Sequence, residues 1–265
     1  MKIIAEVGWN HLGDMNVAKK IIDAAAKSGA DYCKFQTWSV KNLKKGPWDS
    51  DGRRELYNKA ELSYDDHLEL KSYCEKKKIS FLTSIFNIKD IEFLKKITPE
   101  LIKIGSPEIY NLELIEGCLK KFDKVILSTG AAEWKEILDL KKLPNLNRLI
   151  LLHCVSSYPC SSEHINMPRM KDLKEITKMV GYSGHYKGID DALLAICNGA
   201  EYIEKHFTID RDLPGKDNKI SILPSELKFI VDFKNNIEKM QKYQGNEIQE
   251  CEKDTLTTRG RWNKL

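Results

Sequence analysis

Apolar and polar residues follow two patterns along this chain, one typical of strands and one typical of helices. Eight apolar runs of six or seven residues have the length and composition of β-strands, at 2–8, 32–38, 79–85, 101–106, 124–130, 148–154, 179–185 and 202–208. Between and after them, apolar residues recur every three or four positions, as in helices, at 17–29, 65–78, 88–97, 112–121, 134–142, 169–178, 188–200 and 225–240. This alternation predicts a single-domain α/β fold, a (β/α)8 TIM barrel over residues 1–243, followed by a polar C-terminal tail at 244–265. An open doubly wound sheet is the alternative.

The last expected strand has an unusual distribution of polar residues. Because strand side chains alternate between two faces, Ile203, Lys205 and Phe207 share one face, while Glu204 and His206 share the other. A charged side chain is costly in a core unless it is paired or has a function. Glu204 and His206 are therefore candidates for a site, whereas Lys205 has no explanation at this level.

Composition narrows the class of protein. With 42% hydrophobic and 31% charged residues among 265, the chain is typical of a globular protein. The net charge of +4 comes from lysines interleaved with acids, which argues against nucleic acid as a partner. No segment approaches the roughly 20 apolar residues of a membrane helix, and no signal peptide is recognisable, so we expect a cytoplasmic protein without a membrane partner. Seven cysteines without CxxC spacing are expected to be reduced.

Catalytic groups of such barrels lie at the carboxyl ends of the strands, and the expected strands end in polar residues. Two lysines, Lys34 and Lys103, lie inside expected strands. Because a barrel lumen is packed, a lysine there is less easily explained by contact with solvent than a serine at a strand end. We expect the two lysines to converge on a phosphate or carboxylate, with hydroxyl groups of Ser106, Ser128 and Ser183 as further donors. For any single serine, ordinary contact with solvent is the alternative.

Two histidines end neighbouring strands. The imidazoles of His185 and His206 are predicted to meet over the mouth of the barrel, where they suit a catalytic divalent metal, although ordinary hydrogen bonding is an open alternative. His153 is a weaker candidate because it precedes the end of its strand. His67 and His164 are expected to be surface residues.

The motifs taken together resemble the sialic acid (N-acetylneuraminate) synthase family, whose members condense phosphoenolpyruvate with a sugar. The matching stretches are IAEVGWNHLGD (4–14), SGADYCKFQT (28–37), FLTSIF (81–86), IKIGSPE (102–108), ILSTG (126–130), LLHCVSSYP (151–159), VGYSGHYKGI (180–189) and IEKHFTIDRDLPGKDNKIS (203–221). They occur in family order over nearly the whole chain, which makes the resemblance specific. It implies a TIM barrel and a transferase.

The resemblance also implies roles for individual residues. Phosphoenolpyruvate would be held by Lys34, Lys103, Ser84, Ser106, Ser128, Ser156 and Ser183, with Ser84 and Ser156 standing where the family usually has threonine and asparagine. Glu6 would act on a proton or a water at the reacting centre, and His185 and His206 would bind Mn²⁺ or Mg²⁺. Gln36, Tyr158, Glu204 and Asp217 would face the sugar or the metal.

The implied reaction joins phosphoenolpyruvate to an aldose, a hexose or an N-acyl hexosamine, and gives a sialic-acid-like 2-keto-3-deoxy acid for a surface glycan. Two alternatives are the same chemistry on a phosphorylated aldose and a non-catalytic sugar-binding barrel. The family's C-terminal antifreeze-like domain is not expected in this chain, so a homodimer or a separate antifreeze-like chain is a possible partner. Gly184 replaces the family's usual aspartate, and we expect weaker control of His185 and its metal as a result.

Overall fold

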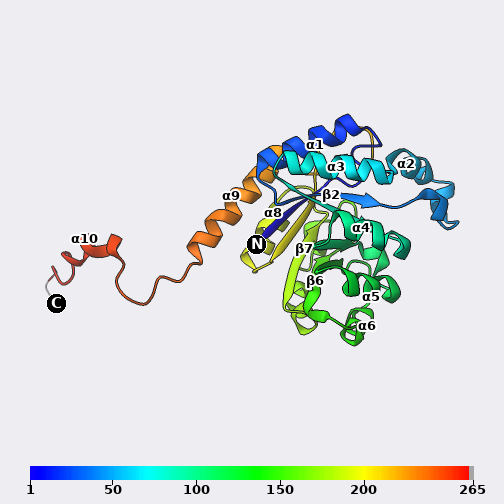
Figure 1. The fold of residues 1–265 in the computed structure, drawn as a ribbon. Coiled ribbons are helices and arrows are strands. Elements are labelled where there is room, and N and C mark those ends of the chain that lie inside the picture. Colours follow the sequence, from blue (N-terminus) through cyan, green and yellow to red (C-terminus); the bar gives the residue numbers. More distant parts are fainter. Residues whose placement is uncertain (263–265) are drawn as a thin grey trace.

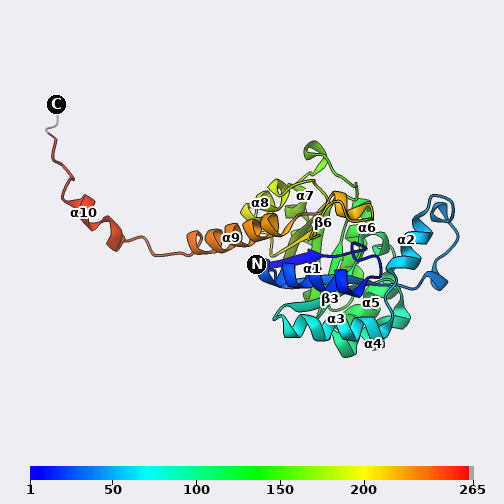
Figure 2. The same cartoon turned by 90° about the horizontal axis from the view of Figure 1, so that it is seen from above.

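Eight parallel strands close into a barrel in the computed structural model, which describes residues 1–262 (Figures 1 and 2). Each strand pairs with its neighbours in chain order, and β1 closes the barrel against β8. The strands are β1 (Lys2–Glu6), β2 (Tyr32–Thr37), β3 (Ser80–Ile85), β4 (Leu101–Ile104), β5 (Lys124–Ser128), β6 (Leu149–Cys154), β7 (Met179–Gly184) and β8 (Tyr202–His206). All eight expected strands and the (β/α)8 fold are confirmed, and the open sheet is excluded.

Helices cover the outside of the barrel (Figure 2). They are α1 (Met15–Ser28), α2 (Arg53–Ala60), α3 (Tyr64–Lys76), α4 (Ile91–Ile97), α5 (Leu112–Lys121), α6 (Trp134–Asp139), α7 (Arg169–Asp172), α8 (Asp190–Cys197) and α9 (Pro224–Met240), with α10 (Lys253–Leu256) beyond the barrel. The short helix α2 was not expected, because its sequence RRELYNKA has no apolar stripe. It lies in the long connection after β2.

The first helix illustrates how local sequence sets the boundaries. Asp14 accepts hydrogen bonds from the backbone of Asn16 and Val17, a cap that contributes about 1 kcal/mol. Gly29 ends the helix in the left-handed conformation at φ 88°, which glycine adopts without steric cost. Between these ends Ala18, Ile21 and other apolar residues at helical spacing are buried against the barrel.

The barrel interior has an apolar lower layer and a charged upper layer. Inward-facing apolar residues fill the lower part and form one buried cluster of Ile4, Leu82, Leu101, Ile126, Ile150, Leu152 and Tyr202. One step further along the same strands, Glu6 and Lys103 lie within the barrel instead. The change from aliphatic to ionisable side chains marks the carboxyl end of the barrel as the chemically equipped one.

The C-terminal segment leaves the body of the protein. Helix α9 packs against α1 and α8, then projects past the barrel, and residues 241–262 continue away from it in both views (Figures 1 and 2). No helix in the described residues combines the length and apolar character needed to cross a lipid bilayer.

One expectation about a side chain is wrong. His67 is fully buried rather than a surface residue, and it contacts the Thr37 hydroxyl and the Ser63 carbonyl, each at 2.7 Å. Its position on α3 faces the barrel, beside Leu70 and Cys74 at helical spacing. His164 is exposed, as expected, and the cysteines are free thiols.

Candidate active site

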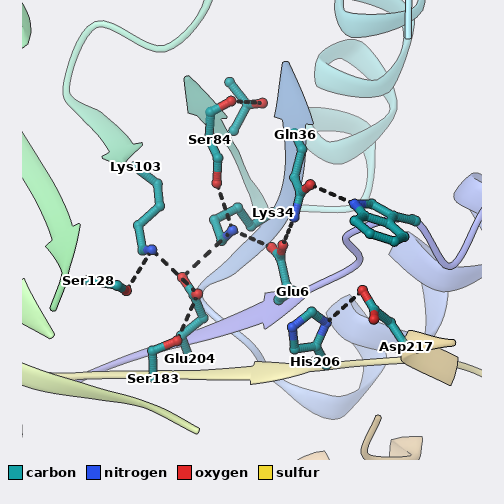
Figure 3. Close-up of polar contacts among 12 residues, drawn as sticks. Glu6, Lys34, Gln36, Ser84, Lys103, Ser128, Ser183, Glu204, His206 and Asp217 are labelled. Atoms are coloured by element: carbon teal, nitrogen blue, oxygen red, sulfur yellow. Dashed lines mark hydrogen bonds and ion pairs between the residues drawn. The ribbon is translucent and has the colours of Figure 1, made fainter. Parts of the chain in front are cut away.

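Four ionisable side chains occupy the upper lumen of the barrel: Glu6, Lys34, Lys103 and Glu204 (Figure 3). None is more than 6% exposed. Lys34 forms an ion pair with Glu6, and the Lys34 Nζ lies 3.8 Å from Glu204 Oε2. The Lys103 Nζ lies 3.7 Å from Glu204 Oε1. Two acids and two bases thus balance one another in a space where a lone charge would be strongly destabilising.

Burial and pairing shift the pKa values of these groups in different directions. For Glu6, burial outweighs the opposing effect of Lys34 and raises the pKa of the carboxyl. Burial also acts on Glu204, but Lys103 and Lys34 outweigh it and hold the pKa of that carboxyl below its ordinary value. Burial lowers the pKa of the Lys103 ammonium, against the effect of Glu204. Glu6 is therefore the more basic carboxylate, the better suited of the two to accept a proton.

Hydroxyl groups surround the two ammonium groups. Lys34 donates to Ser84 Oγ at 2.9 Å, and Lys103 donates to Ser128 Oγ at 2.8 Å. Ser183 donates to Glu204 Oε1 at 3.1 Å, so it joins the same network from β7 (Figure 3). The expected convergence of Lys34 and Lys103 with serines on one site is present in the structure.

Two more serines meet at Gly130, just beyond the end of β5. The Gly130 amide donates to Ser106 Oγ at 3.0 Å. A Cβ atom at Gly130 would lie 2.3 Å from Ser156 Oγ and 2.9 Å from Ser106 Oγ. The close approach of these groups requires glycine here, and it brings the ends of β4, β5 and β6 together beside Lys103.

The two histidines face each other across the mouth. The ring centroids of His185 and His206 are 5.4 Å apart, and the ring of Tyr158 lies 4.1 Å from that of His185. His206 Nδ1 is 3.7 Å from Asp217 Oδ2, a residue from the loop after β8 (Figure 3). Burial lowers the pKa of both imidazoles, that of His206 to about 4, so both are neutral at neutral pH. His153, by contrast, is buried on the outer side and contacts the Ile165 carbonyl.

These residues fit a divalent metal ion. His206 Nδ1 is buried and has no hydrogen-bond partner, and His185 Nδ1 contacts the Val155 carbonyl at 2.9 Å, which leaves its Nε2 available as a ligand. Within residues 1–262 no three His, Cys, Asp or Glu side chains form a ready-made metal site. Two imidazoles would therefore bind the ion together with water or substrate oxygen, the arrangement of an open catalytic site.

Gln36 is held within the protein by two hydrogen bonds. Its Nε2 donates to Glu6 Oε1 at 2.7 Å, and its Oε1 accepts from Trp9 Nε1 at 3.0 Å. Gln36 thereby orients Glu6, and Trp9 in turn orients Gln36. Sequence reasoning missed Trp9, because the two side chains are 27 residues apart and no local pattern relates them.

Gly184 lies on the outer side of the barrel. Along β7 Ser183 faces the lumen, so residue 184 faces outward, and a Cβ there would lie only 2.1 Å from Asp191 Oδ2. The carboxylate of Asp191 fills the space and forms an ion pair with Lys205 at 2.9 Å. Lys205, which had no explanation from the sequence, therefore has a partner, and the effect of Gly184 on His185 and its metal stays a prediction.

A cavity lies at the other end of the barrel, where the strands begin. It measures about 690 Å³ and is lined by residues that begin β1 to β4, including Lys2, Tyr32, Ser80 and Leu101. The lysines that line this cavity lie among the acidic residues Asp31, Glu75 and Glu100. None of its lining side chains has a buried polar atom without a hydrogen-bond partner. Buried ionisable groups with shifted pKa values are typical of active sites, and they lie at the carboxyl end of the barrel. We therefore expect the active site at that end.

Fold and site together define a (β/α)8 enzyme with a buried cluster of lysines and serines beside a pair of histidines. The chain belongs to the NeuB family, which it matches over residues 21–248. The resemblance to sialic acid synthases is thereby confirmed, and the protein is an enzyme of that type.

Similar proteins carry related names. The chain is 38% identical to the N,N'-diacetyllegionaminic acid synthase of Campylobacter jejuni, over 95% of this chain and 79% of that one. It is 32% identical to the human N-acetylneuraminate-9-phosphate synthase, over 86% and 68% respectively. A crystal structure of the N-acetylneuraminic acid synthetase from Leptospira borgpetersenii, in complex with citrate, superimposes with a TM-score of 0.83 at 37% identity, covering 98% of this chain and 91% of that one.

Proposed function

We propose that this enzyme condenses phosphoenolpyruvate with an open-chain aldose, a hexose or N-acyl hexosamine, to give a 2-keto-3-deoxy sugar acid and phosphate. The observation that carries the proposal is the pairing, at one barrel mouth, of a buried lysine and serine site for anions with two neutral imidazoles. Relatives named as synthases of sialic, legionaminic and pseudaminic acids support this class of product.

Phosphoenolpyruvate carries a carboxylate and a phosphate. In our proposal both anions bind at Lys34 and Lys103, with hydrogen bonds from Ser84, Ser128 and Ser183 and from the group around Gly130 that includes Ser106 and Ser156. Binding both anions holds the enol carbon C3 at a constant position relative to the mouth. Such orientation is a large part of the catalysis of a two-substrate reaction.

The proposed reaction forms one C–C bond and breaks the bond between C2 and the phosphate oxygen. C3 of phosphoenolpyruvate attacks the aldehyde carbon and forms the new C–C bond, and the aldehyde oxygen takes up a proton. Water adds to the resulting cation at C2 and loses a proton to a base, for which Glu6 is our candidate because burial raises the pKa of its carboxyl. The C2–O bond to phosphate then breaks while the C2 hydroxyl gives up its proton to the departing phosphate, which leaves the 2-keto acid and inorganic phosphate.

Mn²⁺ or Mg²⁺ is proposed as the cofactor, held by His185 and His206. When bound, such an ion supplies a Lewis acid for the aldehyde oxygen, on which negative charge develops. Asp217 and Tyr158 lie beside the same two rings, and in our proposal they contact the sugar hydroxyls.

A substrate panel tests the proposal. Purified protein with phosphoenolpyruvate and Mn²⁺ is incubated with hexoses, N-acyl hexosamines and their phosphates, and both phosphate and 2-keto acid are measured. We expect equal amounts of the two products with at least one unphosphorylated aldose. Turnover only with phosphorylated sugars would favour the second type of acceptor, and no turnover with any sugar would reject the enzyme activity proposed.

The histidines are tested separately. His206→Ala is expected to abolish turnover and Mn²⁺ binding, while phosphoenolpyruvate still binds at the lysines. His164→Ala, which changes an exposed histidine, is the matched control and should behave as wild type. Retained activity in His206→Ala would remove the metal from the proposal.

A further inference from the structure

A further ion pair, between Lys205 and Asp191, is buried on the outer side of the barrel. Lys205 and Asp191 are 2% and 1% exposed, and neither is part of the lumen. The Lys205 Nζ donates to both carboxylate oxygens of Asp191, at 3.0 and 2.9 Å, and to the Tyr186 carbonyl at 2.8 Å. All three protons of the ammonium group therefore have an acceptor.

The carboxylate of Asp191 is equally well satisfied. Besides Lys205 it accepts from the Tyr182 hydroxyl at 3.1 Å and from the Ala192 amide at 2.8 Å. A buried polar network with every member satisfied is rigid, whereas a partly satisfied one is strongly destabilising. The groups come from β7, the start of α8 and β8, so the network connects three consecutive elements.

Its position in the chain relates it to the histidines. Lys205 directly precedes His206, and Tyr186, whose carbonyl it contacts, directly follows His185. Gly184, which precedes His185, pairs with Lys205 in the barrel register. The network therefore holds both neighbours of His185 and the neighbour of His206.

We propose that Asp191 and Lys205 are positioning residues that fix His185 and His206 relative to each other, and that Gly184 is required because the Asp191 carboxylate fills the space beside it. A side chain at position 184 would meet that carboxylate at 2.1 Å and displace it from Lys205. This inference rests on the proposed metal site at the two histidines, because their spacing matters most when both bind one ion.

The test replaces the charged pair by a neutral pair of similar size. The double variant Lys205→Met/Asp191→Asn leaves no unpaired charge in the interior and is expected to fold, because such replacements are often neutral for stability. Gly184→Ala is a second route, since it keeps both charges and disturbs their geometry. The control is Lys2→Met/Asp31→Asn, an ion pair of 2.8 Å at the amino ends of β1 and β2, the opposite end of the barrel from the two histidines.

Two quantities are measured on metal-free, folded protein: the Kd for Mn²⁺ by calorimetry and the Kd for phosphoenolpyruvate. The kcat is then measured after saturating Mn²⁺ has been added. In the double variant and in Gly184→Ala we expect the Mn²⁺ Kd to rise about tenfold, as for other residues that orient metal ligands. The phosphoenolpyruvate Kd should stay within about twofold of wild type, as for independent sites. A purely structural role would change the melting temperature and leave both Kd values unaltered.

The outcomes separate this inference from the proposed function. A folded double variant that binds Mn²⁺ as tightly as wild type would overturn the positioning role and leave the metal site standing. Wild-type protein that binds no Mn²⁺ would overturn both. A Gly184→Ala variant with wild-type Mn²⁺ affinity would reject the requirement for glycine at that position.

Discussion

Replacing Lys103 by methionine tests the anion site directly. The ammonium group is 2% exposed, donates to Ser128 at 2.8 Å, and lies 3.7 Å from Glu204. Hydrogen bonds to charged groups are worth about 1.5–3 kcal/mol, so Lys103→Met should raise the Kd for phosphoenolpyruvate roughly 10- to 150-fold. Methionine keeps the length of the aliphatic chain, which limits the change in packing.

The same substitution also affects stability. Without Lys103, the nearest cation to the buried Glu204 carboxylate is Lys34 at 3.8 Å. Removing one partner of a buried ion pair costs about 3–5 kcal/mol, which chemical denaturation would detect. The double variant Lys103→Met/Glu204→Gln removes both charges, so it should recover most of the stability and still bind phosphoenolpyruvate weakly.

Calorimetric titration of phosphoenolpyruvate into the single and double variants separates the two effects. Glu204→Gln alone completes the double-mutant cycle and reports how the carboxylate itself influences anion binding. The outward-facing pair Lys205→Met/Asp191→Asn is the matched control, because Lys205 is as buried as Lys103 and should not affect the phosphoenolpyruvate Kd. Wild-type affinity in a stable Lys103→Met/Glu204→Gln protein would refute the assignment of Lys103 to the anion site.

Three further predictions concern single residues. Gly130→Ala should raise the KM for phosphoenolpyruvate about tenfold with little change in fold, because the new Cβ lies 2.3 Å from a serine hydroxyl of the site. Trp9→Phe should lower kcat by freeing Gln36, whereas Trp38→Phe should not, since Trp38 Nε1 has no hydrogen-bond partner; equal effects would reject the orienting role of Trp9. Burial lowers the pKa of His11 to about 4, so below about pH 6.5 the unfolded chain takes up a proton at His11 and the folded chain does not. The free energy of unfolding should therefore decrease by up to about 3 kcal/mol between pH 6.5 and 4. Urea denaturation of His11→Gln should show a smaller decrease over the same pH range.

Much of the architecture could be predicted because parallel strands buried on both faces are continuous apolar runs, which stand out against amphipathic helices. This contrast predicts the eight strands, and the occurrence of Lys34 and Lys103 inside β2 and β4 indicates the position of the site. Helix α2 was missed because it has only three apolar residues among eight, and its place is set by tertiary contacts such as that of Tyr57 with Trp9.

The finer organisation of the site lies beyond the reach of local pattern. His67 has polar neighbours in sequence, Asp65 and Asp66, and only the packing of α3 on the barrel shows that it is buried. Lys205 on β8 pairs with Asp191 on α8, 14 residues earlier in the chain, and periodicity cannot reveal such a pairing. Alternation along β8 did separate the two faces correctly, but the partner of each charge became known only from the fold.

The central claim is that a C–C bond forms and that phosphate leaves with its bridging oxygen. Turnover of phosphoenolpyruvate with a competent aldose in ¹⁸O-labelled water, followed by mass spectrometry of both products, tests this most directly. The proposed chemistry predicts one ¹⁸O atom in the newly formed nine-carbon or related keto acid, read before exchange of the ketone oxygen with water, and none in the phosphate. Labelled phosphate together with pyruvate would mean simple hydrolysis at phosphorus and would contradict the proposed reaction.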